Sequence, residues 1–574
     1  MRAIFIFRLR ILLGILGVIA IVLISRLFVI QIMYGNLYAQ KAKRQYSADT
    51  STLYDRGTIY FTRKDGTHIA VATLENGFLV AVHPGELKNI KMAYNAINAI
   101  TPINEKTFFE LAQKKNDPYE EVAHHLSKKA GEKLARQKIH GVQVIRERWR
   151  IYPAGTLAAH TIGFVAYNDD NTLSGRYGLE RYYNSVLFRS GSTYRNFFAQ
   201  LFSDAGNFFV DADSSRQGDI VTTIEPELEQ HLMDDLARVQ KKFSSKETGG
   251  IIMIPSTGAI VALGSVPTFN PNYFENEDAS TFGNPLVEHV YEFGSIVKAL
   301  TMASGLDAGV ITPQTTYDDT GCITVDKARI CNWDNKARGV IPMIEIIKQS
   351  LNVGASWIAT QLGNDTQRAY FMKLFGHATG VDLSSETTAL LSNLKSPRQV
   401  EYDTAAFGQG IAVTPMQMIR AIGALANGGV MVAPHLVSEK ILQSGKIEYP
   451  DWSAKERVFS AKSTQETVTM MDALMDDELS HGKARIPTMS VAVKTGTAQL
   501  TKPEGGYYKN RFFHSFVGFF PSYAPRFIIL LYTDDPHGAE YSAETLTTSF
   551  MDLTHFLINY YNIAPDRGIT NKSL

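Results

Sequence analysis

One apolar segment near the start of the chain constrains its fold more than any other feature. Residues 11–25 contain no charged side chain, and the apolar pattern resumes after Arg26 and continues to Met33. A helix that crosses a bilayer needs about 20 residues, and residues 11–33 supply that length if Arg26 extends toward the membrane surface. No small-x-small cleavage site follows, so we expect an uncleaved signal anchor rather than a cleaved signal peptide.

The charges around this segment do not decide its orientation, because three arginines precede it and three basic residues follow it. No second apolar segment of this length follows, so we expect the rest of the chain on one side of the membrane. Across the 574 residues, 57 basic side chains balance 57 acidic ones, and no overall charge favours nucleic acid as a partner. The two cysteines exclude a disulfide-rich scaffold and any site of four cysteines.

The chain after the apolar segment divides at residues 203–219, which are rich in glycine, serine and aspartate and are expected to form a boundary. On its N-terminal side, alternation over residues 57–73 around Lys64-Asp65-Gly66 predicts a hairpin. The polar, helically periodic residues 117–139 predict a solvated surface helix. We therefore expect this side to be a mixture of short strands and helices.

On the C-terminal side of the boundary, strand-like segments stand at both ends of a helical region. The expected elements are a hairpin over 249–266, apolar helices between 295 and 430, strands at 489–500, 511–521 and 525–535, and a helix over 542–563. This order predicts an α+β domain with one antiparallel sheet whose first and last strands meet, flanked by helices.

Ser295 and Lys298 stand at the start of one apolar helical pattern. Gly294 permits a sharp turn, and side chains at i and i+3 share a helix face about 5–6 Å apart, so the lysine reaches the hydroxyl. The positive potential of a helix N-terminus and burial both favour a neutral lysine, which can act as the base for a serine nucleophile. An N-capping serine ahead of a solvated lysine explains the pattern equally well.

A second copy of the Ser-x-x-Lys pattern serves as a control. Ser392 and Lys395 match it equally well, but they lie in a polar segment that runs into Pro397. We expect no helix terminus behind this serine and no function for it. The pattern alone therefore does not identify a nucleophile.

Ser350-Leu351-Asn352 falls where one apolar helical stretch ends and the next begins. A hydroxyl and an amide two residues apart can relay a proton and bind a peptide carbonyl. Taken alone, such a sequence between helices is most often a turn with a cap.

Lys494-Thr495-Gly496-Thr497 stands inside an apolar strand pattern, where a lysine is costly to bury unless it faces a cleft. Gly496 leaves room for another backbone to approach the strand. An extended peptide can add along this edge, with its carboxylate on the Lys494 ammonium and the hydroxyls of Thr495 and Thr497. The backbone N–H groups of Ser295 and Thr497 can form an oxyanion hole.

The three patterns follow one another in the order Ser-x-x-Lys, Ser-x-Asn, Lys-Thr-Gly, which resembles the set in serine enzymes that react with penicillin. The chain is similar to the class B penicillin-binding proteins, which are membrane-anchored peptidoglycan D,D-transpeptidases. Other similar stretches are YDRGTIYFTRKDGTHIA, WRIYPAGTLAAHTIGFV with GLERYYNSVL, and AAFGQGIAVTPMQMIRAIGALANGG. The resemblance runs from the anchor to about residue 560.

This resemblance implies a multidomain α+β protein with a single transmembrane helix, a mixed α/β pedestal and a C-terminal transpeptidase domain with a central antiparallel sheet. The implied divisions are a cytoplasmic tail (1–10), the anchor (11–33), a dimerisation-type pedestal (34–215), a connecting segment (216–248), the transpeptidase domain (249–566) and a C-terminal tail (567–574). The bulk of the chain is expected outside the cytoplasmic membrane.

For the site, the resemblance implies that Ser295 attacks the D-Ala-D-Ala bond of a stem peptide and that Lys298 is its base. Ser350 would relay the proton and Asn352 would orient the substrate amide, while residues 494–497 hold the terminal carboxylate. No metal or organic cofactor is implied. The implied partners are peptidoglycan stem peptides, β-lactams as covalent inhibitors, a membrane glycosyltransferase and a cell-wall synthesis complex, and no nucleic acid.

Two features depart from the family or lie outside its pattern. Phe293 and Ile296 stand where the family commonly has Pro and Thr, and they are expected to reshape the rim of the pocket. Cys322 and Cys331 fall on the two expected arms of a hairpin. A disulfide between them is permitted outside the membrane and is slightly favoured over two buried thiols.

Several alternatives stay open at this point. By resemblance, the compact N-terminal module and the overall length favour a division role only weakly, and an elongation or sporulation role is the alternative. A β-lactam-hydrolysing enzyme or sensor would lack the long N-terminal region, and a non-catalytic scaffold would have no reason to keep the site residues. A bifunctional enzyme would need a glycosyltransferase domain, which residues 34–215 do not resemble.

Overall fold

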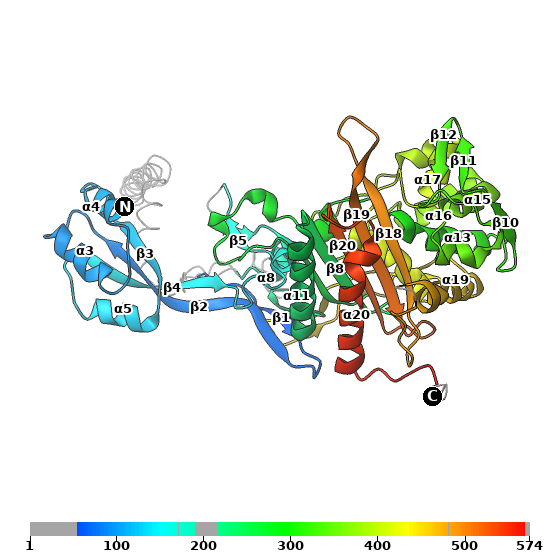
Figure 1. The fold of residues 1–574 in the computed structure, drawn as a ribbon. Coiled ribbons are helices and arrows are strands. Elements are labelled where there is room, and N and C mark those ends of the chain that lie inside the picture. Colours follow the sequence, from blue (N-terminus) through cyan, green and yellow to red (C-terminus); the bar gives the residue numbers. More distant parts are fainter. Residues whose placement is uncertain (1–53, 170–171, 190–215, 480–481, 569–574) are drawn as a thin grey trace, which may run out of the picture. The chain divides into compact units, whose positions relative to one another are not determined.

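The computed structural model describes residues 54–169, 172–189, 216–479 and 482–568 (Figure 1). The expected anchor and most of the expected boundary segment lie outside these ranges. Within them, no helix has the length and apolar character to cross a bilayer. The described residues group into a smaller unit, 54–55 and 74–149, and a larger unit that holds the rest.

The smaller unit packs short helices against a strand ladder. It contains the second half of β2 (His68–Val82), α3 (Ile90–Asn98), α4 (Glu105–Ala112), β3 (Glu120–Leu126), α5 (Lys128–Ala135) and most of β4 (Val142–Ile151). The prediction of a surface helix over 117–139 is wrong for the first half of that range, where the structure has strand β3. Residues 120–126 instead pair with β2, Phe78 opposite Leu126, because this pairing buries Leu126 in the core of the unit.

The hairpin expected over 57–73 is confirmed, and it belongs to the larger unit. β1 (Ile59–Thr62) pairs antiparallel with the start of β2, with Thr62 opposite His68. β1 also lies parallel to β7 (Gly218–Thr222), which pairs with β15 (Val437–Leu442). Strands from three distant parts of the sequence therefore form one sheet in the larger unit.

A second, five-stranded sheet forms the centre of the larger unit. Its order is β18 (Ala492–Thr501), β19 (Tyr507–Phe520), β20 (Phe527–Asp534), β8 (Glu247–Met253) and β9 (Ile260–Val266). All neighbours are antiparallel. The expected meeting of the first and last strands is confirmed, since Ile529 of β20 lies opposite Ile252 of β8.

Helices cover both faces of this sheet, as expected. Consecutive strand residues point to opposite faces, and Ile251 and Ile252 accordingly pack into different hydrophobic clusters. On one face, α11 (Pro226–Phe243) and α20 (Ser542–Tyr560) run side by side (Figure 1). On the other, α12 (Pro285–Glu288) and α18 (Pro415–Ala426) contact the sheet.

The remaining elements surround this core. The helices are α6 (Ala159–Ile162), α7 (Gly178–Tyr182), α8 (Asn184–Leu187), α13 (Val297–Asp307), α14 (Met343–Lys348), α15 (Asn352–Leu362), α16 (Asn364–Phe375), α17 (Gln399–Ala405) and α19 (Ala461–Ala473). The strands are β5 (Val165–Tyr167), β6 (Leu173–Gly175), β10 (Thr316–Asp319), β11 (Cys322–Val325), β12 (Ala328–Cys331), β13 (Gly339–Pro342), β14 (Val430–Val432), β16 (Ile447–Glu448) and β17 (Lys455–Arg457).

Candidate active site

Ser295 lies in a single 3-10 turn, Gly294–Ile296, that runs directly into α13. Neither this turn nor α13 is capped by a side-chain hydrogen bond, so Ser295 does not serve as an N-cap. Lys298 is in the first turn of α13 and only 1% of its surface is exposed. The capping serine and the solvated lysine that would explain the pattern without function are therefore both absent from this part of the structure.

Ser350 stands between α14 and α15, as the sequence predicts, and two lysines reach it. Lys298 Nζ donates to the Ser350 carbonyl oxygen at 2.6 Å and to Ser350 Oγ at 3.2 Å. Lys494 Nζ donates to the same Oγ at 3.0 Å and to the carbonyl oxygen of Thr495 at 3.0 Å. Ser350 has a positive φ of 55°, a conformation that a non-glycine residue rarely adopts and that concentrates at functional sites.

Burial shifts the charge states of both lysines. The pKa of Lys298 lies well below the ordinary lysine value because burial disfavours its ammonium and because Lys494 is close to it. Burial alone lowers the pKa of Lys494 to about 7. A neutral amine at Lys298 can accept a proton, as a general base must.

Gly496 brings the Ser295 turn against strand β18. A Cβ at Gly496 would lie 2.3 Å from the carbonyl oxygen of Phe293 and 2.4 Å from Ser515 Oγ. The Ser515 hydroxyl donates to that same carbonyl oxygen at 3.1 Å. The missing side chain of Gly496 therefore leaves room for the backbone of Phe293, two residues before Ser295, to approach β18.

The outer side of β18 is free of any partner strand among the described residues, because β18 is the end strand of its sheet. Thr495 and Thr497 are half-buried on this strand. The backbone N–H of Ser542 donates to Thr497 Oγ1 at 3.1 Å, so the Thr497 hydroxyl proton stays available for another acceptor. The strand thus offers two hydroxyls and one lysine within four residues.

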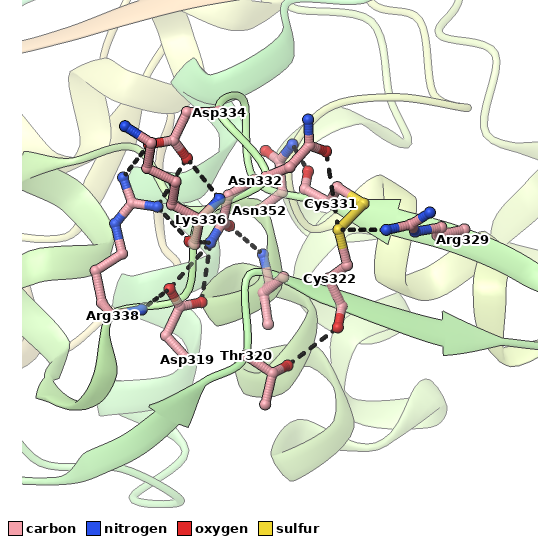
Figure 2. The surroundings of a disulfide bond; sticks show 12 residues. Asp319, Thr320, Cys322, Arg329, Cys331, Asn332, Asp334, Lys336, Arg338 and Asn352 are labelled. Atoms are coloured by element: carbon pink, nitrogen blue, oxygen red, sulfur yellow. Dashed lines mark hydrogen bonds and ion pairs between the residues drawn. A yellow bond between two sulfur atoms is a disulfide. The ribbon is translucent and has the colours of Figure 1, made fainter.

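Asn352 is the first residue of α15, two residues after Ser350. Its Nδ2 donates to the carbonyl oxygen of Cys331 at 2.8 Å. Cys331 forms a disulfide with Cys322 across the β11–β12 pair (Figure 2). The two cysteines, whose pairing the sequence left open, are thus joined next to the site.

The control serine lies elsewhere. Ser392–Lys395 forms a short 3-10 helix in which both Ser392 and Lys395 are exposed. The same four-residue pattern therefore lies at the surface at Ser392 and in a buried cluster at Ser295.

The expectation for Phe293 and Ile296 is wrong. They do not line a rim, since Phe293 is 1% exposed and Ile296 is fully buried. The Phe293 ring packs edge-on against Tyr291 and Phe513, with ring centroids 6.5 and 5.3 Å away. Both side chains therefore anchor the Ser295 turn in the hydrophobic core.

Some supporting residues were not found from the sequence as individuals. A Cβ at Gly408 would lie 2.2 Å from the carbonyl oxygen of Gly294, and the Gly294 N–H donates to the Gly408 carbonyl at 3.2 Å. Glu292 accepts from the Gly410 N–H at 3.1 Å and from the Tyr507 hydroxyl, and burial raises its pKa to about 7. The sequence signal for these contacts is the stretch AAFGQG, in which two glycines close together indicate a tightly packed backbone.

One group of side chains in the described ranges has the spacing of a metal site, and it is not at Ser295. His231 and Asp235 on α11 and Asp552 on α20 bring their ligand atoms within 4.8 Å of one another. Arg238 forms ion pairs with both carboxylates. The guanidinium therefore already supplies the positive charge that these acidic groups require.

Comparison with known proteins gives two family matches that together span most of the chain. Residues 248–552 match the family described as "Penicillin binding protein transpeptidase domain". Residues 53–193 match "Penicillin-binding Protein dimerisation domain".

Relatives and solved structures agree with these matches. Stage V sporulation protein D of Bacillus subtilis is 28% identical over 91% of this chain and 81% of its own length. Peptidoglycan D,D-transpeptidase FtsI of Buchnera aphidicola is 24% identical over 96% of this chain and 94% of its own. Penicillin binding protein 3 of Mycobacterium tuberculosis, solved with aztreonam, superposes with a TM-score of 0.68 at 19% identity, over 91% of this chain and 99% of that one.

Proposed function

The chain belongs to the class B penicillin-binding proteins and is a serine-type peptidoglycan D,D-transpeptidase, and we propose that Ser295 is its nucleophile. The observation that carries this assignment is the convergence of Lys298 and Lys494 on Ser350 Oγ, in a buried cluster next to the Ser295 turn. The exposed Ser392 has no comparable surroundings.

Acylation uses the neutral amine of Lys298. Ser295 Oγ attacks the carbonyl carbon between the two D-alanines of a stem peptide while Lys298 accepts the hydroxyl proton. The Oγ–C bond forms, and the C–N bond then breaks as Ser350 Oγ passes a proton to the leaving nitrogen and takes one from Lys298, which becomes neutral again. D-alanine departs and an acyl-enzyme ester is left on Ser295. The backbone N–H groups of Ser295 and Thr497 bind the oxyanion.

Binding of the substrate carboxylate falls to β18. An extended stem peptide adds along this end strand. Its terminal carboxylate accepts hydrogen bonds from the Thr495 and Thr497 hydroxyls and pairs with the Lys494 ammonium. Asn352 directs an amide N–H toward the peptide backbone, which fixes the scissile bond over Ser295.

The second half-reaction completes the cross-link. An amine of a neighbouring stem peptide attacks the ester carbonyl, the new C–N bond forms and the C–Oγ bond breaks. Lys298, neutral again in the acyl-enzyme, accepts a proton from the attacking amine and passes it to Ser295 Oγ. β-Lactams, whose strained amide imitates the D-Ala-D-Ala bond, acylate Ser295 by the same first step and stop there.

The cellular setting follows the family. We assign residues 11–33 as the membrane anchor, with residues 1–10 cytoplasmic and the rest on the outer side of the cytoplasmic membrane, where peptidoglycan lies. In that assignment 34–215 is the pedestal, 216–248 the connecting segment, 249–566 the transpeptidase domain and 567–574 a tail. A membrane glycosyltransferase within a cell-wall synthesis complex supplies the glycan strands.

The role in septum formation is the narrower part of the proposal. Similarity to proteins named FtsI over most of the chain supports it. Similarity to a sporulation protein supports the alternative. Imaging of a fluorescent fusion in growing cells separates the two, because a division enzyme gives a midcell band during every cell cycle.

The enzymatic assignment is tested with a stem pentapeptide ending in D-Ala-D-Ala and an amine acceptor. Wild-type protein is expected to release D-alanine and form the cross-linked product, and the Ser295→Ala variant to form neither. Release of D-alanine at wild-type rate by the Ser295→Ala variant would reject Ser295 as the nucleophile.

A further inference from the structure

The mechanism above makes no use of the Cys322–Cys331 disulfide, although it lies beside the site. Strands β11 and β12 have four residues each and pair antiparallel, with Cys322 opposite Cys331 at the open end. Asp326 and Lys327 form the turn, both with positive φ. A two-stranded hairpin of this size is marginally stable on its own. A cross-link at its open end keeps the two strands together.

The end of β12 holds the start of α15 at two points. The carbonyl oxygen of Cys331 accepts from Asn352 Nδ2 at 2.8 Å. One residue on, Asn332 Oδ1 accepts from the backbone N–H of Val353 at 3.1 Å. Leu351, the N-cap residue of α15, gives no side-chain hydrogen bond, so Asn332 caps this helix from a neighbouring segment.

Asn332 is itself fixed in a buried network. Its Nδ2 donates to both carboxylate oxygens of Asp319, at 2.9 and 3.0 Å (Figure 2). Asp319 also accepts from the backbone N–H of Arg338 at 3.1 Å. Asn332 is 2% exposed and Asp319 is fully buried. The position of Asn332 therefore depends on the Asp319 carboxylate and on β12, which ends at the preceding residue.

We propose that the Cys322–Cys331 disulfide positions Asn352 for catalysis. It closes the β11–β12 hairpin and thereby fixes the Cys331 carbonyl and Asn332. These two groups orient the Asn352 amide and the first turn of α15, immediately after Ser350. The inference rests on the proposed function, because it takes Asn352 as the group that orients the substrate.

The cross-link also makes this positioning sensitive to reduction. Both cysteines are half-buried, so a small dithiol reaches them. The dithiol supplies two electrons and two protons, the S–S bond becomes two thiols, and the dithiol closes to a cyclic disulfide. The hairpin then opens more readily, and the amide of Asn352 loses its fixed acceptor.

The test compares acylation rates of the full-length protein by a fluorescent penicillin. The oxidised wild type is measured against the same protein treated with dithiothreitol and against C322A/C331A. Both changes are expected to slow acylation about three- to tenfold, the range set by one ordinary hydrogen bond. The C322A/C331A variant is expected not to respond to dithiothreitol, which controls for other effects of the reductant. The treated wild-type protein provides the comparison even if the variant folds poorly.

A double-mutant comparison separates an effect of the disulfide on Asn352 from a general loss of order around the site. In an Asn352→Ala background, dithiothreitol is expected to have no further effect on the rate, because the positioned group is gone. Equal rates for oxidised and reduced wild type would overturn the inference, and so would an equal slowing of the Asn352→Ala variant. Absence of any labelling of the oxidised wild type would overturn both this inference and the proposed function.

Discussion

Lys298 and Lys494 bring two buried amines to one oxygen atom, with their Nζ atoms 3.2 and 3.0 Å from Ser350 Oγ. Two ammonium groups so close together in a buried site repel each other, so one of them gives up its proton first. The pKa of Lys298 is lowered by burial and by Lys494. This supports our proposal that Lys298 is the neutral base and that Lys494 keeps the charge that attracts a carboxylate.

This division of roles predicts a bell-shaped pH dependence of the second-order acylation rate. Toward acid pH, Lys298 becomes protonated and cannot accept the Ser295 proton, so the rate falls. Toward alkaline pH, Lys494, with its pKa of about 7, loses its charge and its attraction for carboxylate, so the rate falls again. Stopped-flow measurement with a chromogenic β-lactam across this range gives both limbs.

The alkaline limb has its own control. A guanidinium stays charged throughout this range, so the Lys494→Arg variant is expected to lose the descending limb near neutrality, at a lower overall rate. An unchanged limb in that variant would show that Lys494 is not the titrating group.

Replacement of Ser350 by Ala removes the oxygen that both lysines share. Lys298 keeps its bond to the residue 350 carbonyl, but proton transfer to the leaving nitrogen loses its relay. We expect acylation to fall by about 10²–10⁴-fold, the range for a lost proton-transfer group. Ser356→Ala is the control, because Ser356 is a buried serine on the neighbouring helix α15 and its hydroxyl donates to the Asp403 carbonyl instead. A Ser350→Ala enzyme as fast as this control would contradict the relay.

Gly496→Ala tests the packing of the Ser295 turn against β18. The new methyl group would press on the Phe293 carbonyl and on Ser515, which costs about 1–3 kcal/mol of folding stability or moves the turn. We expect a lower melting temperature together with slower acylation. Gly568→Ala, where a Cβ meets no atom within 4 Å, is expected to change neither. Normal acylation and stability in Gly496→Ala would show that the turn is not held as described.

Glu229 predicts a pH dependence of stability that is separate from catalysis. It is fully buried in α11, and the Leu263 N–H is its one donor within the described part of the chain. Burial raises its pKa from 4.5 to about 8. Because the folded-state value lies above the unfolded one, its contribution is fully present below pH 4.5 and is lost as the pH rises through 8. Glu229→Gln is expected to flatten this loss in thermal unfolding measured against pH.

The exposed Glu227 in the same helix is the control for this effect. Glu227→Gln is expected to leave the pH dependence as it is in wild type. A wild-type stability that does not decline between pH 4.5 and 8 beyond that of Glu229→Gln would refute the assignment of this buried carboxyl.

Much of the larger unit was predictable because its central strands are short apolar runs and its helices show a helical period in the sequence itself. The pairing of β8 with β20 followed from strands at both ends of a helical region. The segment 120–126 was not predictable as a strand, because its charged, helix-like pattern is overridden by pairing with β2. Local pattern carries no information about a partner that lies some 45 residues away.

The site shows the same limit. The residue types and their order pointed to Ser295, Ser350 and Lys494. The convergence of Lys298 and Lys494 on Ser350 Oγ, and the burial of Phe293, depend on how distant segments pack. The sequence favoured the disulfide only slightly, because two cysteines nine residues apart are also compatible with free thiols, and the structure confirms the bond.

The most direct test of Ser295 as the nucleophile is to identify the residue that a fluorescent penicillin labels. Wild-type protein and the Ser392→Ala variant are expected to be labelled equally, with the adduct on Ser295 by peptide mass mapping, and Ser295→Ala is expected to carry no label. Labelling that persists in a folded Ser295→Ala protein, or an adduct mapped to any other serine, would contradict the central claim.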